Sequence, residues 1–176
     1  MSPRLDKVQL LINEYNPAMQ DACKDTGLFV SVCMAQFILE TGYGKTIRKA
    51  ARNLFGIKAG IKWPGKVASL STCEFQNGKK IKYVGTGEIY NTRVDALKDN
   101  ANPVTIFRAY DSYVDSILDR NDLLLHTLRY KPVLKALTSE DQCYQLKKCG
   151  YATAPQYDKV LISIIHSNNL TELDKK

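Results

Sequence analysis

The chain has 176 residues, of which 44% are hydrophobic and 24% charged, and it contains no repetitive tract. This composition excludes a disordered protein, and the length is short for two ordinary domains, so we expect one globular domain over residues 1–176. The formal net charge of +7 would suit an anionic partner such as nucleic acid, an acidic membrane surface or an acidic wall polymer. The basic residues are scattered along the chain, which disfavours a dedicated nucleic-acid surface.

Several kinds of site are disfavoured by what the sequence lacks. No apolar run has the length of a signal peptide or a membrane-spanning helix, so we expect neither an export signal nor membrane insertion in this chain. The two histidines, His126 and His166, are far apart and give little support to a metal site, and we expect no cofactor. The cysteines are odd in number, include no C-x-x-C pair and are expected to be free thiols, mostly buried; they are Cys23, Cys33, Cys73, Cys143 and Cys149.

The first part of the chain has a helical pattern. Apolar residues recur at helical spacing within residues 5–15, and Asn16-Pro17 then supplies a cap residue followed by proline at a first helical position. We therefore expect two helices, the second running from Pro17 to about residue 25. The next stretch, 28–39, is apolar on nearly every face, which predicts the central buried helix of the fold.

Glu40 ends this central helix and is the first candidate catalytic residue. A carboxylate there is poorly solvated and lies near the negative end of the helix dipole, and both effects favour the protonated form that a general acid needs. Gly42 and Gly44 allow a sharp turn directly after it, so the carboxyl group can face an open cleft. The alternative is an exposed residue at the end of an ordinary core helix, and this stretch alone does not decide between the two.

The middle of the chain predicts loops followed by a hairpin. The hexapeptide Asn53-Leu-Phe-Gly-Ile-Lys58 suits a loop packed against a core. Trp63 stands beside a Pro-Gly turn, where it either lines a cleft that stacks on sugars or fills a small core. Strands over 71–75 and 80–84 flank Asn77-Gly78, which is a strong hairpin signal.

The hairpin belongs to a predicted β lobe at about residues 68–110, and Glu74 lies on its first strand. Residues 85–103 are polar and turn-rich, so we expect an insertion or a mobile flap there, followed by a strand over 105–110. Taken alone, Glu74 would more often be an exposed strand residue than a catalytic one.

The rest of the chain is helical in pattern. One helix begins after residue 111, a short one follows Lys131-Pro132, another opens after Thr138-Ser-Glu140 and stops at Gly150, and the last covers about 156–167. The whole pattern predicts an α+β fold that is mostly helical.

Five segments, taken together, resemble the glucosaminidase domains of glycoside hydrolase family 73, which include the hydrolase half of flagellar rod-assembly proteins, autolysins and phage endolysins. Each segment alone is weakly specific, but five in the correct order are specific. They are Ala35-Gln-Phe-Ile-Leu-Glu-Thr-Gly-Tyr-Gly44, Asn53-Leu-Phe-Gly-Ile-Lys58, Thr72-Cys-Glu-Phe75, Phe107-Arg-Ala-Tyr-Asp-Ser-Tyr113 and Gly150-Tyr-Ala-Thr-Ala-Pro-Gln-Tyr157. The sequence departs from the family in the length of 85–103 and at Ala154, where the family usually has aspartate.

The resemblance implies a lysozyme-like fold, with a helical lobe, a small β-hairpin lobe and a groove between them for a peptidoglycan strand. It implies an endo-β-N-acetylglucosaminidase that cuts the β-1,4 bond between N-acetylglucosamine and N-acetylmuramic acid. Glu40 matches the family's general acid, Glu74 its second carboxylate, and Tyr151 a tyrosine beside the reacting sugar. Candidates for binding the sugars are Tyr43, Asn53, Phe55, Trp63, Tyr110 and Tyr157, with packing roles equally open for Phe55 and Tyr110.

Other interpretations stay open on the sequence. A muramidase or a lytic transglycosylase could use the same fold, and Ala154 leaves room for a non-catalytic wall-binding module. The second catalytic role could belong to a carboxylate that activates water or to the acetamido oxygen of the substrate. We expect a monomer that acts at the bacterial cell wall, either as a phage enzyme made in the cytosol and released, or as a domain excised from a secreted protein.

Overall fold

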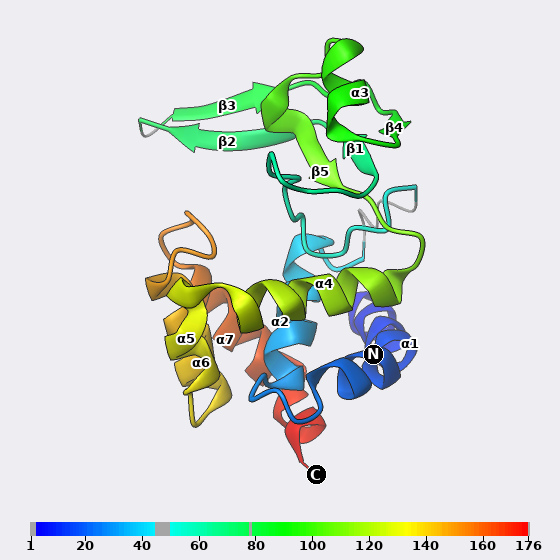
Figure 1. Cartoon of the computed structure of the whole chain (residues 1–176). Helices are drawn as coiled ribbons and strands as arrows, with labels where there is room; N and C mark the ends of the chain where they lie inside the picture. The colour runs from blue at the N-terminus through cyan, green and yellow to red at the C-terminus, as the bar shows by residue number, and fades with distance from the viewer. Residues whose placement is uncertain (1–2, 45–49, 78, 176) are drawn as a thin grey trace. The chain divides into compact units, whose positions relative to one another are not determined.

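The computed structural model describes residues 3–44, 50–77 and 79–175, and the chain divides into two compact units (Figure 1). The helical unit contains residues 1–46 and 117–176, and the β unit contains residues 47–116. The β unit begins before residue 68, where the predicted β lobe began. The added part includes residues 57–59, which pair with the strand at 106–108.

The helical unit is built around α2 (Val30–Glu40), as predicted. Every residue from Val30 to Ile38 is buried, because α2 is contacted by α1, α6, α7 and the 3-10 helix η3 (Leu170–Asp174) (Figure 1). A helix that is apolar all round is stable only in such an interior position. The central position of α2 therefore follows from its sequence.

The start of α2 is held by side chains from distant parts of the chain. Gln142 accepts a hydrogen bond from the backbone N–H of Phe29 at 3.0 Å and donates to the carbonyl of Gly27 at 3.0 Å. The carboxylate of Asp174 accepts from the backbone N–H of Ser31 at 2.9 Å. These contacts satisfy N–H groups that a helix start leaves without an intrahelical partner, and an acidic group there also suits the helix dipole.

The first helix differs from the prediction of two helices. α1 runs without a break from Pro3 to Cys23 and contains Pro17 in its interior. Buried residues recur on one face on both sides of the proline, at Val8, Ile12, Tyr15 and Met19 among others. Packing of this continuous stripe outweighs the local cost of proline, and Pro17 itself is exposed. No helix among the described residues is both long and apolar enough to cross a membrane.

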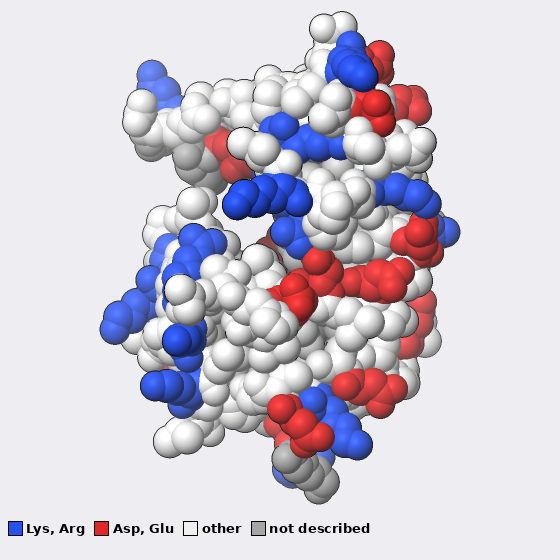
Figure 2. Space-filling view, viewed as in Figure 1, with Lys and Arg blue, Asp and Glu red and all other residues white. Residues whose placement is uncertain are grey.

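The remaining helices follow the predicted order. Thr138 caps one of them by accepting a hydrogen bond from the N–H of Asp141 at 3.1 Å. Figure 2 shows basic side chains gathered over the part of the surface that α5 and α6 form, and these segments include Lys131, Lys147 and Lys148. The elements are α4 (Tyr113–His126), η2 (Leu128–Tyr130), α5 (Lys131–Leu134), α6 (Ser139–Lys148) and α7 (Tyr157–Ser167).

The β unit contains two small antiparallel sheets. β1 (Val67–Ser69) lies between β4 (Ile89–Tyr90) and β5 (Ile106–Arg108). The predicted hairpin is confirmed as β2 (Thr72–Gln76) paired with β3 (Lys79–Tyr83), and Glu74 lies opposite Ile81. Asn77 has a left-handed φ of 50°, as a tight bend requires, and Gly78 lies outside the described residues.

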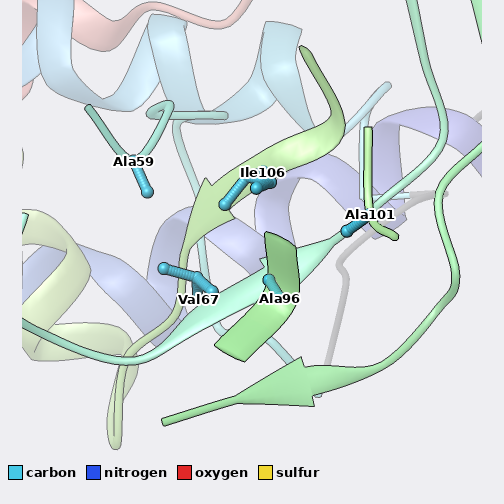
Figure 3. Packing of buried hydrophobic residues seen from close by; sticks show 5 residues of the cluster. All are labelled: Ala59, Val67, Ala96, Ala101 and Ile106. Atoms are coloured by element: carbon cyan, nitrogen blue, oxygen red, sulfur yellow. The ribbon is translucent and has the colours of Figure 1, made fainter. Parts of the chain in front are cut away.

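The stretch 85–103 is folded rather than a structureless flap. It contributes β4 and α3 (Arg93–Lys98), which Thr92 caps, and it leads into the 3-10 helix η1 (Pro103–Thr105). Figure 3 shows its two buried alanines in a small cluster with residues from β1, β5 and the loop at 59. The cluster consists of Ala59, Val67, Ala96, Ala101 and Ile106.

Candidate functional site

The helical unit places Glu40 at the last position of α2, directly before a tight turn. Gly42, Tyr43 and Gly44 all have left-handed backbone angles, with φ of 56°, 61° and 73°. The turn satisfies carbonyl groups of the last helical turn, since the N–H of Gly42 donates to Leu39 at 3.0 Å and that of Tyr43 donates to Ile38 at 2.8 Å. The chain thus leaves the helix at once, and Glu40 ends a rigid element.

The environment of Glu40 disfavours its charged form. The side chain of Glu40 is accessible to solvent. Beyond its immediate neighbours, however, it is surrounded mostly by protein, which takes the place of water that would stabilise a carboxylate. This desolvation raises the pKa of Glu40 from its ordinary 4.5 to about 7. The group is therefore reachable by a substrate and partly protonated at neutral pH, which are the two requirements for a general acid.

Two predicted site residues, Tyr151 and Tyr157, lie close to Glu40. Their rings stack with centroids 5.9 Å apart, and the ring centroid of Tyr130 lies 6.2 Å from that of Tyr151. Burial raises the pKa of Tyr151, the Arg120 guanidinium opposes that effect, and the charge of Glu40 adds to it. Burial, Tyr151 and Glu40 likewise raise the pKa of Tyr157. Both hydroxyls therefore stay protonated at neutral pH and can donate hydrogen bonds.

Two residues that the sequence analysis did not single out support this arrangement. Gln36 lies one turn before Glu40 on α2, and its amide donates to the hydroxyl of Tyr157 at 2.8 Å. Arg120 on α4 is fully buried, and its Nε donates to the amide oxygen of Gln36 at 3.0 Å. The sequence contained a signal for both residues. Gln36 is a polar residue within an apolar helix, and Arg120 lies at helical spacing from the apolar residues Ile117 and Leu124, on the side expected to face the core.

The β unit places Glu74 on β2, where it forms an ion pair with Lys58. The distance from the Lys58 Nζ to Oε1 of Glu74 is 2.9 Å, and the side chains are 41% and 35% exposed. Thr72 donates to the same oxygen at 3.3 Å. The carboxylate is thus fixed at one oxygen on a partly exposed strand.

Two predicted substrate-binding residues of the β unit, Asn53 and Phe55, are buried. The Asn53 amide nitrogen donates to the carbonyls of Ile57 at 2.9 Å and Arg108 at 2.8 Å, and its oxygen accepts from the N–H of Ile57 at 3.1 Å. Asn53 therefore holds the 53–57 turn onto the end of β5. Sugar binding by these two residues stays a prediction.

Trp63 and Tyr110 form an aromatic pair in the β unit, with ring centroids 6.0 Å apart in an edge-to-face arrangement. The guanidinium of Arg108 lies 4.3 Å from the Trp63 ring, and the indole N–H donates to the carbonyl of Lys66 at 2.9 Å. Trp63 also packs against the alanine-rich cluster of Figure 3, and Tyr110 is only 7% exposed. These contacts fit the packing role, and stacking on sugars stays a prediction for both residues.

The structure thus gathers Glu40, Tyr151 and Tyr157 in the helical unit, next to the turn that contains Tyr43. The other candidates, including Glu74, belong to the β unit. Among the described residues, no group of three His, Cys, Asp or Glu side chains could hold a metal ion. A carboxyl group with a raised pKa at the end of a buried helix, within electrostatic range of two tyrosines, suits acid catalysis at an oxygen of a substrate.

Comparison with known proteins identifies the family. A sequence model of glucosaminidases, described as mannosyl-glycoprotein endo-beta-N-acetylglucosaminidase, matches residues 16–170. The chain belongs to this family. The resemblance to glycoside hydrolase family 73 that the five segments indicated is therefore confirmed.

This glucosaminidase resembles longer proteins. It is 31% identical over 154 residues to the peptidoglycan hydrolase FlgJ of Pseudomonas aeruginosa, a match that covers 84% of this chain and 34% of FlgJ. It is 27% identical over 172 residues to the exo-glucosaminidase LytG of Bacillus subtilis, which covers 97% of this chain and 55% of LytG. The glucosaminidase thus spans between a third and about half of the length of these relatives.

A solved structure supports the fold of the glucosaminidase. The crystal structure of a peptidoglycan hydrolase mutant from Sphingomonas sp. A1 matches with a TM-score of 0.74 and 30% identity, over 94% of this chain and 97% of that chain. The predicted fold class, α+β and mostly helical, is confirmed.

Proposed function

We propose that this glucosaminidase hydrolyses bacterial peptidoglycan at the β-1,4 bond between N-acetylglucosamine and N-acetylmuramic acid, with Glu40 as the general acid. The observation that carries the proposal is the position of Glu40 at the solvent-accessible end of a buried helix, where desolvation raises its pKa to about 7. The names of its relatives, peptidoglycan hydrolase and exo-glucosaminidase, supply the substrate class. The place of action would be the cell wall, the partner a glycan strand, and we expect a monomer.

In the proposed reaction Glu40 donates its proton to the bridging oxygen of the scissile bond. Bond cleavage leaves positive charge on the anomeric carbon, and protonation of the leaving oxygen lowers the barrier because an alcohol leaves more easily than an alkoxide. A carboxyl group with an ordinary pKa would have lost this proton at neutral pH. The desolvation of Glu40 is therefore the property that the reaction needs.

The second catalytic role is to supply a nucleophile or negative charge at the anomeric carbon. In our proposal Glu74 activates water for this attack, and the acetamido oxygen of the substrate is the alternative nucleophile. Tyr151 would orient the acetamido group or the water, because its raised pKa keeps its hydroxyl a hydrogen-bond donor.

The test is digestion of purified peptidoglycan followed by mass spectrometry of the new reducing ends. We expect reducing N-acetylglucosamine, and we expect Glu40→Gln to lower the rate at least about 100-fold, the usual contribution of general acid catalysis. Glu14→Gln, at an exposed position of α1, is the matched control and should keep the wild-type rate. The lengths of the released fragments separate internal cleavage from release at chain ends.

Other products would overturn parts of the proposal. Reducing N-acetylmuramic acid would identify a muramidase, and 1,6-anhydro ends would identify a lytic transglycosylase. Binding to the wall without cleavage, and unchanged by Glu40→Gln, would identify a non-catalytic wall-binding module.

A further inference from the structure

Lys58 occupies a well-defined position in the β unit. It follows the turn that Asn53 holds, and its backbone forms an isolated antiparallel bridge with Phe107 of β5. On either side of it, the N–H of Arg108 donates to the carbonyl of Ile57 at 3.0 Å, and the N–H of Ala59 donates to that of Ile106 at 3.1 Å. The backbone of Lys58 is thus fixed to the sheet.

The ammonium group of Lys58 has three close partners. Its Nζ lies 2.5 Å from the carbonyl oxygen of Val104 and 2.9 Å from Oε1 of Glu74. It also lies 3.9 Å from the centroid of the Phe107 ring, within the range of a cation–π contact. Since an ammonium has three N–H donors, a carbonyl, a carboxylate and an aromatic face can hold the charge in one place.

In the part of the chain that the structure describes, the polar contacts of the Glu74 carboxylate are made by one of its two oxygens. Oε1 forms the ion pair with Lys58 and accepts a hydrogen bond from the hydroxyl of Thr72 at 3.3 Å. Among the described residues, no hydrogen-bond donor contacts Oε2. One oxygen is therefore anchored, while the other stays available to accept a proton from water or to face positive charge.

We propose that Lys58 is a positioning residue, which anchors Oε1 of Glu74 so that Oε2 is presented to the reaction. The inference rests on the proposed function, in which Glu74 is the second carboxylate. Lys58 itself would not touch the sugar. Its contribution would be made through Glu74 and would appear in the catalytic rate constant rather than in substrate affinity.

The pair is well suited to a direct test because it is partly exposed. Ion pairs on a surface contribute little to stability, so removal of the Lys58 charge should leave the fold intact. The β unit also offers a matched control, because Lys66 forms a comparable exposed ion pair with Asp111 at 2.6 Å. Circular dichroism and thermal unfolding would verify that each variant is folded.

The experiment is a double-mutant cycle on a soluble glycan-strand substrate, with kcat and KM measured separately. We expect Lys58→Met to lower kcat by about 10- to 100-fold with little change in KM, a range typical of a misplaced catalytic group. In a Glu74→Gln background the same substitution should change kcat by less than about threefold, because its effect passes through Glu74. Lys58→Arg should recover most of kcat, and Lys66→Met should match the wild type.

Three outcomes would overturn the inference alone, and a fourth would also overturn the proposed function. Equal losses from Lys58→Met in both backgrounds would show that Lys58 acts independently of Glu74. A change in KM alone would make Lys58 a substrate contact. A normal rate for Glu74→Gln, with Glu40→Gln inactive, would remove Glu74 from the reaction and leave the proposed glucosaminidase activity standing. Absence of any cleavage by the wild type would instead overturn the proposed function, and the inference with it.

Discussion

At the scale of single residues, the proposed chemistry depends on the different surroundings of two carboxyl groups, those of Glu40 and Glu74. Glu40 has lost much of its surrounding water, and its pKa is raised to about 7. Glu74, in contrast, lies beside the ammonium of Lys58. Two carboxyl groups in such different environments are suited to different roles, one donating a proton and the other providing negative charge.

The pKa of Glu40 predicts how activity depends on pH. A general acid acts only while protonated, so kcat/KM should fall about tenfold per pH unit above pH 7, where Glu40 loses its proton. The measurement is a pH–rate profile on a soluble glycan substrate at constant ionic strength. A rate that stays constant from pH 6 to about pH 9 would contradict the assignment of Glu40 as the acid.

The pH dependence of the stability of the Glu40→Gln variant tests the raised pKa of Glu40 independently of activity. Between pH 4.5 and about 7 the folded protein holds the Glu40 proton more tightly than the unfolded chain does, so rising pH lowers the free energy of unfolding across this window. Glutamine stays neutral and avoids this loss. We therefore expect Glu40→Gln to raise the unfolding temperature at pH 8 and to leave it nearly unchanged at pH 4, with Glu14→Gln showing neither effect.

The sequence predicted the desolvated environment of Glu40 but not the residues that lie behind it. A carboxylate at the end of an apolar helix, followed by glycines, predicts desolvation directly from composition, so Glu40 could be found. Gln36 and Arg120 were missed because their hydrogen bond joins α2 to α4, 84 positions apart in the chain. The sequence also did not show that the side chain of Asn53 forms hydrogen bonds with the backbone, since one of its partners, the carbonyl of Arg108, is 55 residues away.

At the scale of elements, α2 and the turn after it hold Glu40, the proposed acid, in place. The helix is buried along its length, and its start is held by Gln142 and Asp174. After its end, Gly42, Tyr43 and Gly44 all have left-handed backbone conformations. Of the three, only Tyr43 has a Cβ atom, which makes this conformation unfavourable. The two glycines therefore allow the turn to form with less strain.

Gly44 permits a test of this turn. Its φ is +73°, and an added Cβ would lie 2.5 Å from Cδ1 of Leu11, a buried residue of α1. We expect Gly44→Ala to lower the free energy of unfolding by about 1–2 kcal/mol from the backbone alone. Urea denaturation would measure it. Gly60→Ala is the control, because nothing lies within 4 Å of an added Cβ there and the loss should be absent.

Elements with a strong local pattern were predicted well, and those decided by packing were not. The hairpin and the helix that opens close to Thr138 have short-range signals, and the structure confirms both elements. The break predicted at Pro17 was wrong, because the buried stripe of α1 is stabilised by contacts with α2 that local propensity does not include. The stretch 85–103 looked like a flap because it is polar, yet its Ala96 and Ala101 are buried in a cluster with residues of β1 and β5.

At the scale of the whole molecule, the net charge of +7 is the property that bears on the proposed substrate. Part of this charge is gathered over α5 and α6 (Figure 2). Positive charge attracts anionic polymers over about a Debye length, roughly 10 Å at 0.1 M salt. A cell wall that carries acidic polymers should therefore concentrate the enzyme before any sugar enters the site.

This attraction predicts that wall binding, unlike the chemical step, depends on salt. Raising the salt concentration from about 0.05 to 0.5 M should weaken binding to purified walls severalfold and leave kcat on a short uncharged glycan nearly unchanged, because screening acts between exposed charges. Co-sedimentation with walls would measure the binding.

The double substitution Lys131→Gln and Lys148→Gln should reduce both the binding and its dependence on salt. The matched control, Lys62→Gln with Lys98→Gln in the β unit, removes the same charge from other exposed positions. Equal effects of the two pairs would mean that net charge alone, rather than the basic surface over α5 and α6, attracts the enzyme to the wall.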